Sequence, residues 1–426
     1  MILFLLVVLL VSFSACDMNE EPDEITSKYH TLTIEMEGEG LISWNRIDEK
    51  GYLDSATETK ELEIENDALV NLTAKPDEDY IFSSWEGQVQ DTRSTETSVM
   101  VNKDQNVKAI FYEIHDGEFI RVSADEGKGF YWDYILYVPN EIDKNNKDYI
   151  KNMLVIPNNT GYLSDEYEEH YQEAKNTHLY YFVARELKTP LIIPVFPRPR
   201  TIEGAPKDFN YYTHILDRGT MKLEIEEYER LDKQLISMID HSQNILENKG
   251  LNLKQEVLMW GFSASGHFIN RFVMLHPERI QAAAYGGFSE IILPLTEMEV
   301  NGEVKDLIYS VGISDIEKII GKSFNEEAYK NIPQYITRGK ADYNDHLPNE
   351  DKKVKDLIIE VFDTEPAYGD TLEDAKLIID RHKLAKEVYE EKGVLAEFEF
   401  YEDLGHDISE KMMNNMIGFL KENAEN

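Results

Sequence analysis

Between residues 29 and 113, hydrophobic and polar side chains alternate in short runs. Turn-forming Gly, Asn, Asp and Pro residues separate these runs, which are residues 32–36, 62–64, 70–74, 99–101 and 107–111. An alternation with period two is typical of strands that bury one face and expose the other. Residues 29–113 therefore predict a small all-β domain.

The pattern changes after residue 113, where longer amphipathic stretches alternate with compact apolar runs. Residues 119–124 and 131–138 predict an antiparallel pair of strands. The predicted strands that follow are residues 152–156, 191–196, 256–259, 282–285, 335–337 and 396–401, and the predicted helices are residues 165–187, 224–247, 371–392 and 409–422. Such alternation predicts an α/β domain over residues 114–426, with a mostly parallel sheet covered by helices on both faces.

One connection in this domain is much longer than the others. Residues 289–333 separate two predicted strands, and such a length exceeds that of an ordinary connection in a compact domain. The segment contains apolar stretches of its own. We expect it to form a lid-like insertion, or a wall beside the binding site.

The chain begins with an apolar run, residues 1–15, which suits the core of a signal peptide better than an ordinary membrane span. The run ends in Phe13-Ser14-Ala15-Cys16, which resembles a bacterial lipobox, and the following residues to position 28 read as an acidic tether. The resemblance implies a lipid on Cys16, which is the only cysteine of the chain. It also implies an extracytoplasmic protein anchored to a membrane. The alternative is a buried thiol in an uncleaved anchor helix.

The composition excludes one class of partner. The chain of 426 residues is 42% hydrophobic and carries a net charge of −39. Nucleic-acid binding requires clustered Lys and Arg, which the chain does not concentrate, so we expect no nucleic-acid partner.

The strongest chemical signal is the stretch Trp260-Gly261-Phe262-Ser263-Ala264-Ser265-Gly266-His267. It lies between a predicted strand and an amphipathic run that stops at Pro277, which is the strand–turn–helix context of a nucleophile elbow. A serine hydroxyl becomes a nucleophile when such a turn holds it beside a base and beside N–H groups that stabilise an oxyanion. Ser263 is the candidate nucleophile. Ser265 stands where the usual pattern has glycine, and Gly266 follows it.

A base and an acid for Ser263 follow in chain order. His406 lies on the loop that leaves the last predicted strand, and it is the candidate base. Asp342, three residues after Gly339, is the candidate acid that orients the imidazole, with Asp345 as the alternative. The order Ser, Asp, His is that of α/β-hydrolases.

With these motifs, residues 116–426 resemble α/β-hydrolases of the polyhydroxybutyrate-depolymerase-like and feruloyl-esterase-like groups. The residues that carry the resemblance are the 261–266 elbow, the Gly339-x-x-Asp342 turn and Gly405-His406. The resemblance implies an oxyanion hole built from the N–H of Ala264 and that of Asn159 or Thr160. It also implies a reaction that needs no metal or organic cofactor.

The first domain resembles a bacterial repeat domain related to internalin B-repeats. Its features are Gly-Glu-Gly at 38–40, Leu-Thr-Ala-Lys-Pro at 72–76, Trp-x-Gly at 85–87 and the closing run 107–111. The resemblance implies a spacer or adhesion unit that contacts a glycan or another surface. It does not imply catalysis.

Together these features predict an extracytoplasmic serine hydrolase that acts on a carboxylic ester through an acyl-enzyme. Two other hypotheses remain. One is a surface adhesion or polymer-binding lipoprotein that uses the hydrolase fold only as a scaffold. The other is a serine peptidase of the same fold.

Overall fold

The computed structural model of the chain describes residues 28–46, 50–77, 80–92, 94–113, 117–142, 151–159, 161, 163–205, 215–344, 352–362 and 372–424. The expected signal peptide and Cys16 lie outside these residues. The chain divides into two compact units, one built mainly from residues up to Ile110 and the other mainly from Phe111 onward. Each unit is described by itself.

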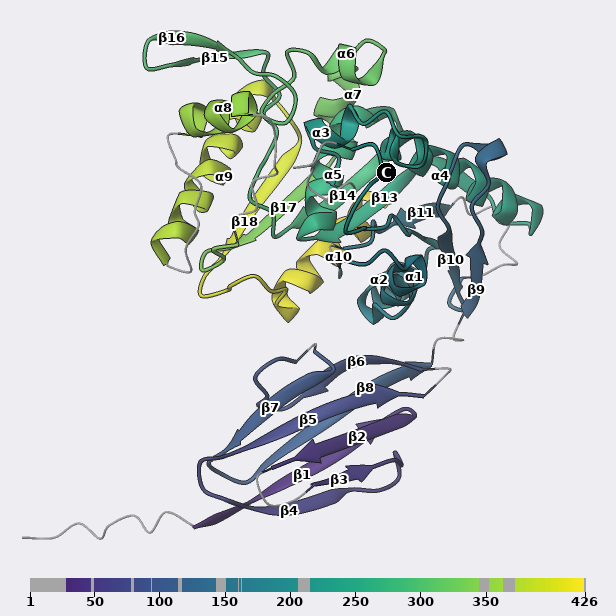
Figure 1. Cartoon of the computed structure of the whole chain (residues 1–426), viewed down its shortest axis with the longest axis vertical. Coiled ribbons are helices and arrows are strands. Elements are labelled where there is room, and N and C mark those ends of the chain that lie inside the picture. Colours follow the sequence, from purple (N-terminus) through teal and green to yellow (C-terminus); the bar gives the residue numbers. More distant parts are fainter. Residues whose placement is uncertain are drawn as a thin grey trace, which may run out of the picture. The chain divides into compact units, whose positions relative to one another are not determined.

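The first unit consists of two four-stranded sheets, with strand orders β4-β1-β8-β6 and β3-β2-β5-β7 (Figure 1). Alternate side chains are buried along most of its strands, as the period-two pattern predicts. The expectation of an all-β unit is confirmed. Its strands are β1 Tyr29–Glu37, β2 Gly40–Asn45, β3 Lys50–Leu53, β4 Lys60–Glu65, β5 Ala68–Pro76, β6 Tyr80–Glu86, β7 Glu96–Val101 and β8 Gln105–Glu113.

The second unit is organised around an eight-stranded sheet in the order β9-β10-β12-β11-β13-β14-β17-β18. Strand β10 is antiparallel to β9 and β12, and the pairs from β12 to β18 are parallel. The expected α/β-hydrolase-like fold is confirmed. The strands are β9 Gly117–Val122, β10 Tyr134–Pro139, β11 Lys151–Val155, β12 Leu191–Pro194, β13 Leu253–Phe262, β14 Ile280–Gly286, β17 Gln334–Gly339 and β18 Ala396–Tyr401.

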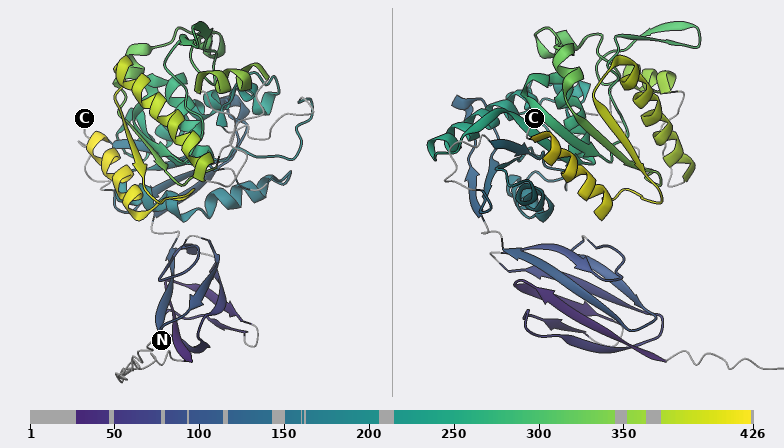
Figure 2. Two further views of the ribbon diagram at one scale, coloured as in Figure 1. Left: turned by 90° about the vertical axis from the view of Figure 1, so that its left-hand side faces the viewer. Right: turned by 180° about the vertical axis from the view of Figure 1, so that it is seen from behind.

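Helices cover both faces of this sheet (Figures 1 and 2). One buried cluster packs the sheet against α1 Tyr167–Lys175, α2 His178–Leu187 and α10 Glu410–Ala424. The other cluster packs the opposite face against α4 Leu231–Asn248, α5 Ala264–Leu275, α8 Lys352–Phe362 and α9 Leu372–Lys392. Among the described residues, no helix combines the length and the apolar character that crossing a bilayer requires.

Two predicted helices differ from those observed. The single helix predicted over residues 165–187 is two helices, because Asn176 ends α1 and Thr177 precedes α2. The helix predicted from residue 224 begins only at Leu231. A short 3-10 turn, Glu226–Tyr228, comes first, and Arg230 at φ 50° then turns the chain. A left-handed residue cannot continue a right-handed helix, so α4 begins after it.

The long connection between β14 and β17 contains a hairpin and two short helices. These are β15 Glu297–Val300, β16 Glu303–Asp306, α6 Ile316–Ile320 and α7 Glu326–Asn331. Its apolar side chains join the core on the α4 side of the sheet; they include Ile292, Leu293, Leu307, Tyr309, Ile316 and Tyr329. An ion pair connects α6 to the short helix α3 Arg218–Met221. Arg218 Nη2 lies 2.6 Å from Oδ2 of Asp315, the residue that precedes α6.

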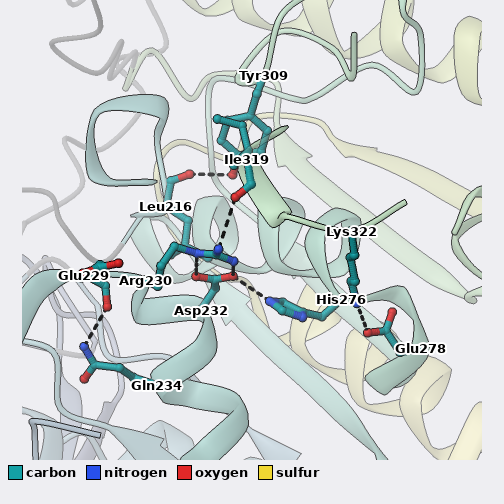
Figure 3. Close-up of polar contacts among 10 residues, drawn as sticks. All are labelled: Leu216, Glu229, Arg230, Asp232, Gln234, His276, Glu278, Tyr309, Ile319 and Lys322. Atoms are coloured by element: carbon teal, nitrogen blue, oxygen red, sulfur yellow. Dashed lines mark hydrogen bonds and ion pairs between the residues drawn. The ribbon is translucent and has the colours of Figure 1, made fainter. Parts of the chain in front are cut away.

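A buried ionic cluster joins this segment to α4 and to the end of α5 (Figure 3). Arg230 donates to both carboxylate oxygens of Asp232, at 2.8 and 2.5 Å, and also to the carbonyl oxygen of Ile319 at the end of α6, at 3.2 Å. His276 contacts the Asp232 carboxylate at 2.7 Å, and Lys322 pairs with Glu278 nearby.

The Asp232 side chain has no exposed surface. Burial by itself raises the pKa of a carboxyl group. At Asp232 the hydrogen bonds and charges of His276 and Arg230 outweigh burial, and they hold the pKa well below its ordinary value. The carboxylate therefore stabilises the fold in its ionised form.

Replacing Asp232 by Asn leaves Arg230 without its charged partner, so we expect Asp232→Asn to lower the free energy of unfolding by about 3–5 kcal/mol at neutral pH. Chemical denaturation measures this. Because the folded-state pKa is depressed, the wild-type contribution is present above the unfolded-state pKa, about 3.9, and is lost as pH falls below it. The difference between wild type and variant should therefore shrink below about pH 4.

Asp240→Asn is the matched control, because Asp240 lies on the same helix and its pair with Arg279 is half exposed. We expect it to cost less than about 1 kcal/mol. Equal losses for the two variants would show that the buried cluster has no special role.

Candidate active site

The turn at Ser263 joins the end of β13 to the start of α5. Ser263 adopts φ 63° and ψ −126°, a conformation that side chains other than glycine rarely adopt, and its N–H donates to the carbonyl oxygen of Gly286 at 2.9 Å. Such strain persists only where the surrounding structure holds it. The turn places the hydroxyl of Ser263 at the carboxyl end of a central strand, as the elbow motif predicts.

The structure explains why the motif accepts Ser265 in place of glycine. The Ser265 hydroxyl accepts from the Phe262 N–H and donates to the Phe262 carbonyl oxygen, both at 2.8 Å, and the residue is 1% exposed. This hydroxyl is bonded inside the turn and is not accessible from solvent. At Gly266, a Cβ would lie 2.4 Å from the Gly286 carbonyl oxygen, so the glycine allows α5 to approach β14.

Ser263, His406 and Asp342 form a hydrogen-bonded triad. His406 Nε2 lies 2.9 Å from Ser263 Oγ, and His406 Nδ1 lies 3.0 Å from Asp342 Oδ2. A carboxylate only accepts, so Nδ1 carries the proton and Nε2 is free to accept the serine proton. The imidazole side chain is 30% exposed, whereas the Asp342 side chain is fully buried. The alternative acid, Asp345, lies outside the described residues.

Gly339 brings the loops that carry Asp342 and His406 together. A Cβ at Gly339 would lie 2.1 Å from the Leu404 carbonyl oxygen, so only glycine permits this approach. The Lys340 N–H donates to Tyr401 and the Ala341 N–H donates to Leu404, at 2.8 and 3.0 Å. The Gly339-x-x-Asp342 pattern thus reflects a requirement for close backbone contact.

A buried arginine binds the other side of the Asp342 carboxylate. Arg338 Nη2 lies 3.2 Å from Asp342 Oδ1, and it donates to the carbonyl oxygens of Asp342 and Asn344 at 3.0 Å. The Asn344 N–H donates to Asp342 Oδ1 at 3.0 Å. Burial raises the pKa of Asp342, but the hydrogen bond from His406 and the charge of Arg338 outweigh it and lower the pKa.

His382 of α9 lies behind this group and is fully buried. Burial, together with the charge of Arg338, lowers its pKa to about 3, so it stays neutral near neutral pH. His382 therefore adds no positive charge near Asp342, and the cation that offsets the negative charge of Asp342 is Arg338. Sequence reasoning missed Arg338, which appears in the chain only as a polar residue near the end of a buried strand.

The residues expected to form an oxyanion hole are only partly arranged as expected. The Ala264 N–H is directed out of the turn and donates to the side-chain oxygen of Asn159 at 3.1 Å. The backbone N–H of Asn159, expected to be the second donor, instead faces the Tyr180 hydroxyl and opposes the rise that burial causes in the pKa of Tyr180. Thr160 lies outside the described residues. The sequence offers no signal for this use of the Asn159 side chain.

Within the described ranges, no three His, Cys, Asp or Glu side chains are grouped closely enough to hold a metal ion. His267, on α5, accepts from the backbone N–H groups of Ser289 and Glu290 at 3.2 and 3.3 Å. It therefore fastens the start of the 289–333 segment to α5.

The strand order and the Ser–His–Asp triad show that the second unit has an α/β-hydrolase-like fold. Residues 55–115 match the family model of the divergent InlB B-repeat domain. A search of curated protein sequences found no match.

Three solved structures illustrate what the chain is similar to. Poly(aspartic acid) hydrolase-1 from Sphingomonas sp. KT-1 is 15% identical, with a TM-score of 0.43 and coverage of 73% of this chain and 98% of that chain. LpqC, a poly(3-hydroxybutyrate) depolymerase from Bordetella parapertussis, is 15% identical (TM-score 0.41; 68% and 85% covered). A thermostable esterase is 12% identical (TM-score 0.38; 94% and 96% covered). At these identities and scores the comparisons say nothing about the reaction.

We expect Arg338→Met to raise the pKa of Asp342, because the variant removes the cation whose charge lowers that pKa. The titration midpoint is measured by NMR of the Asp342 side-chain carboxyl carbon. Lys340→Met is the control, because it removes an exposed cation paired with Glu402. A midpoint that stays in place or falls in Arg338→Met would show that Arg338 does not offset the charge of Asp342.

Proposed function

We propose that the second unit is a serine hydrolase that cleaves carboxylic esters through an acyl-enzyme on Ser263. The observation that carries the proposal is the position of His406, whose imidazole contacts Ser263 Oγ and the buried Asp342 carboxylate at once. This is the arrangement that makes a serine hydroxyl nucleophilic near neutral pH.

The reaction follows from this geometry. Ser263 Oγ attacks the ester carbonyl carbon while His406 Nε2 takes the hydroxyl proton. The carbon–oxygen bond to the alcohol then breaks, and His406 returns the proton to the departing alkoxide. A water molecule, deprotonated by His406, next attacks the acyl carbon. The bond to Ser263 Oγ then breaks as His406 returns the proton to Oγ, which releases the acid and restores the serine hydroxyl.

Asp342 holds the imidazole in the tautomer with its proton on Nδ1, and it stabilises the imidazolium that forms during each transfer. The Ala264 N–H is a donor for the tetrahedral oxyanion, because it is the first N–H after the nucleophile and lies at the N-terminus of α5. The proposed mechanism requires no metal or cofactor.

An ester is favoured over a peptide because an alkoxide leaves more easily than an amine and needs less help from the protein. The resemblance of the elbow and of the Gly405-His406 loop to depolymerase-like and feruloyl-esterase-like sequences supports the same choice. We place the protein outside the cytoplasm, held at a membrane through a lipid on Cys16. The first unit would present the enzyme at a surface or bind a polymeric substrate.

We expect Ser263→Ala to lower hydrolysis of short p-nitrophenyl esters by at least about 10³-fold and to abolish labelling by a fluorophosphonate. Ser265→Ala is the matched control. Its hydroxyl is bonded within the turn, so this variant should keep its labelling and lose no more than a few-fold in rate.

Labelling that is lost in Ser265→Ala but kept in Ser263→Ala would reverse the assignment of the nucleophile. A wild-type protein that neither turns over esters nor reacts with the probe would contradict the proposal and favour a binding protein on this scaffold. Faster cleavage of peptide amides than of matched esters would favour a peptidase.

The anchor has its own test. We expect Cys16→Ser, expressed in a bacterium that lipidates its own lipoproteins, to incorporate no labelled palmitate and to move from the membrane fraction to the soluble fraction. The wild-type chain should incorporate the label. Equal membrane association of the two chains, with no label in either, would argue for an uncleaved anchor helix.

A further inference from the structure

The N–H that would stabilise the oxyanion is already occupied in this structure. Asn159 Oδ1 lies 3.1 Å from the Ala264 nitrogen, within the distance range that an oxyanion would occupy. The two oxygens cannot occupy the same position, so a reacting carbonyl reaches Ala264 only if the Asn159 carboxamide moves. The Asn159 side chain is thus in direct competition with the transition state.

The backbone around Asn159 has little freedom to supply a donor of its own. The Asn159 N–H faces the hydroxyl of Tyr180, a residue that is 4% exposed. The preceding residue, Asn158, is also buried, and its side chain both donates to and accepts from the backbone of Phe196, at 2.9 and 3.1 Å. These contacts fasten the loop after β11 to the loop after β12. The side chain of Asn159 is exposed by contrast, and can rotate without disturbing that junction.

We propose that Asn159 provides the second oxyanion donor through its side-chain amide, and that in the resting protein the oxygen of the same group caps the Ala264 N–H. This proposal rests on the serine hydrolase function proposed above. A carboxamide carries an acceptor and two N–H donors on one carbon. Withdrawal of Oδ1 frees the Ala264 N–H, and rotation of the amide turns Nδ2 toward the oxyanion, which then accepts from both groups.

The exchange is favoured only when charge develops on the substrate oxygen. The resting contact joins a neutral donor to a neutral acceptor, whereas an oxyanion forms charge-assisted bonds that are about twice as strong. A ground-state ester carbonyl competes less well for the Ala264 N–H. The Asn159 carboxamide therefore discriminates between ground state and transition state, so its loss should lower kcat more than it changes KM.

Asn159→Leu tests this role, because leucine has nearly the same size and neither donates nor accepts. We expect kcat for p-nitrophenyl acetate to fall about 10²- to 10³-fold, as for the loss of other side-chain oxyanion donors, with KM within about three-fold of wild type. The affinity for an aryl trifluoromethyl ketone, which forms an oxyanionic adduct with serine, should fall by a similar factor. Asn159→Asp keeps the shape but removes the donor and adds a negative charge, so its kcat should fall at least as far.

Asn244→Leu is the control, since Asn244 is an exposed residue of α4 whose side-chain amide donates to the Asp240 carbonyl oxygen. It should keep its kcat, and the thermal midpoints of the variants should stay within a few degrees of wild type. If Asn159→Leu does not fold, the kcat of Asn159→Asp tests the proposal in its place.

An unchanged or higher kcat in the Asn159 variants would overturn the proposal and would make the side chain a plug or a helix cap. A change in KM alone would also overturn it, in favour of a substrate contact. All of these comparisons are made against a wild type that hydrolyses the ester. A wild type without that activity would contradict the proposed serine hydrolase function, not only the role of Asn159.

Discussion

The site at the carboxyl end of the sheet depends on the burial of one negative charge, that of Asp342. Asp342 has no exposed side-chain surface, and an unpaired carboxylate in that position would be prohibitively unfavourable. Its oxygens are therefore bound by His406, by Arg338 and by the Asn344 N–H. These partners come from β17, from the loop after it and from the loop after β18. Pairing this carboxylate therefore holds the ends of two adjacent strands, β17 and β18, and the imidazole in one arrangement.

Much of this arrangement was predictable from the sequence because it depends on local patterns. Period-two alternation identified five strands of the first unit, β1, β4, β5, β7 and β8, but not β2, β3 or β6. The alternation of apolar runs with amphipathic stretches identified the parallel sheet. The order of Ser263, Asp342 and His406, each at the carboxyl end of a predicted strand, was enough to expect them to meet. Parallel strands bring such positions to one edge of a sheet.

The remaining features were not predictable because no pattern of apolar and polar positions marks them. Arg338 contacts Asp342 only because β17 ends in a turn that folds back on it, and nothing in the local pattern distinguishes it from a surface arginine. Asn159 meets Ala264 across 105 residues. The break between α1 and α2 also has no strong signal, because neither Asn176 nor Thr177 excludes a helix.

The ionic cluster around Asp232 affects how readily residues 289–333 separate from the rest of the unit by local unfolding. Arg230 binds the last turn of α6 and the start of α4 through one guanidinium group, so the 289–333 segment shares its buried ionic centre with a helix that packs on the central sheet. The segment cannot lift away without exposing that centre to water. Amide hydrogens at the end of α6 should therefore exchange with solvent through openings nearly as rare as those of the core, so that the 289–333 segment and the central sheet behave as one cooperative unit.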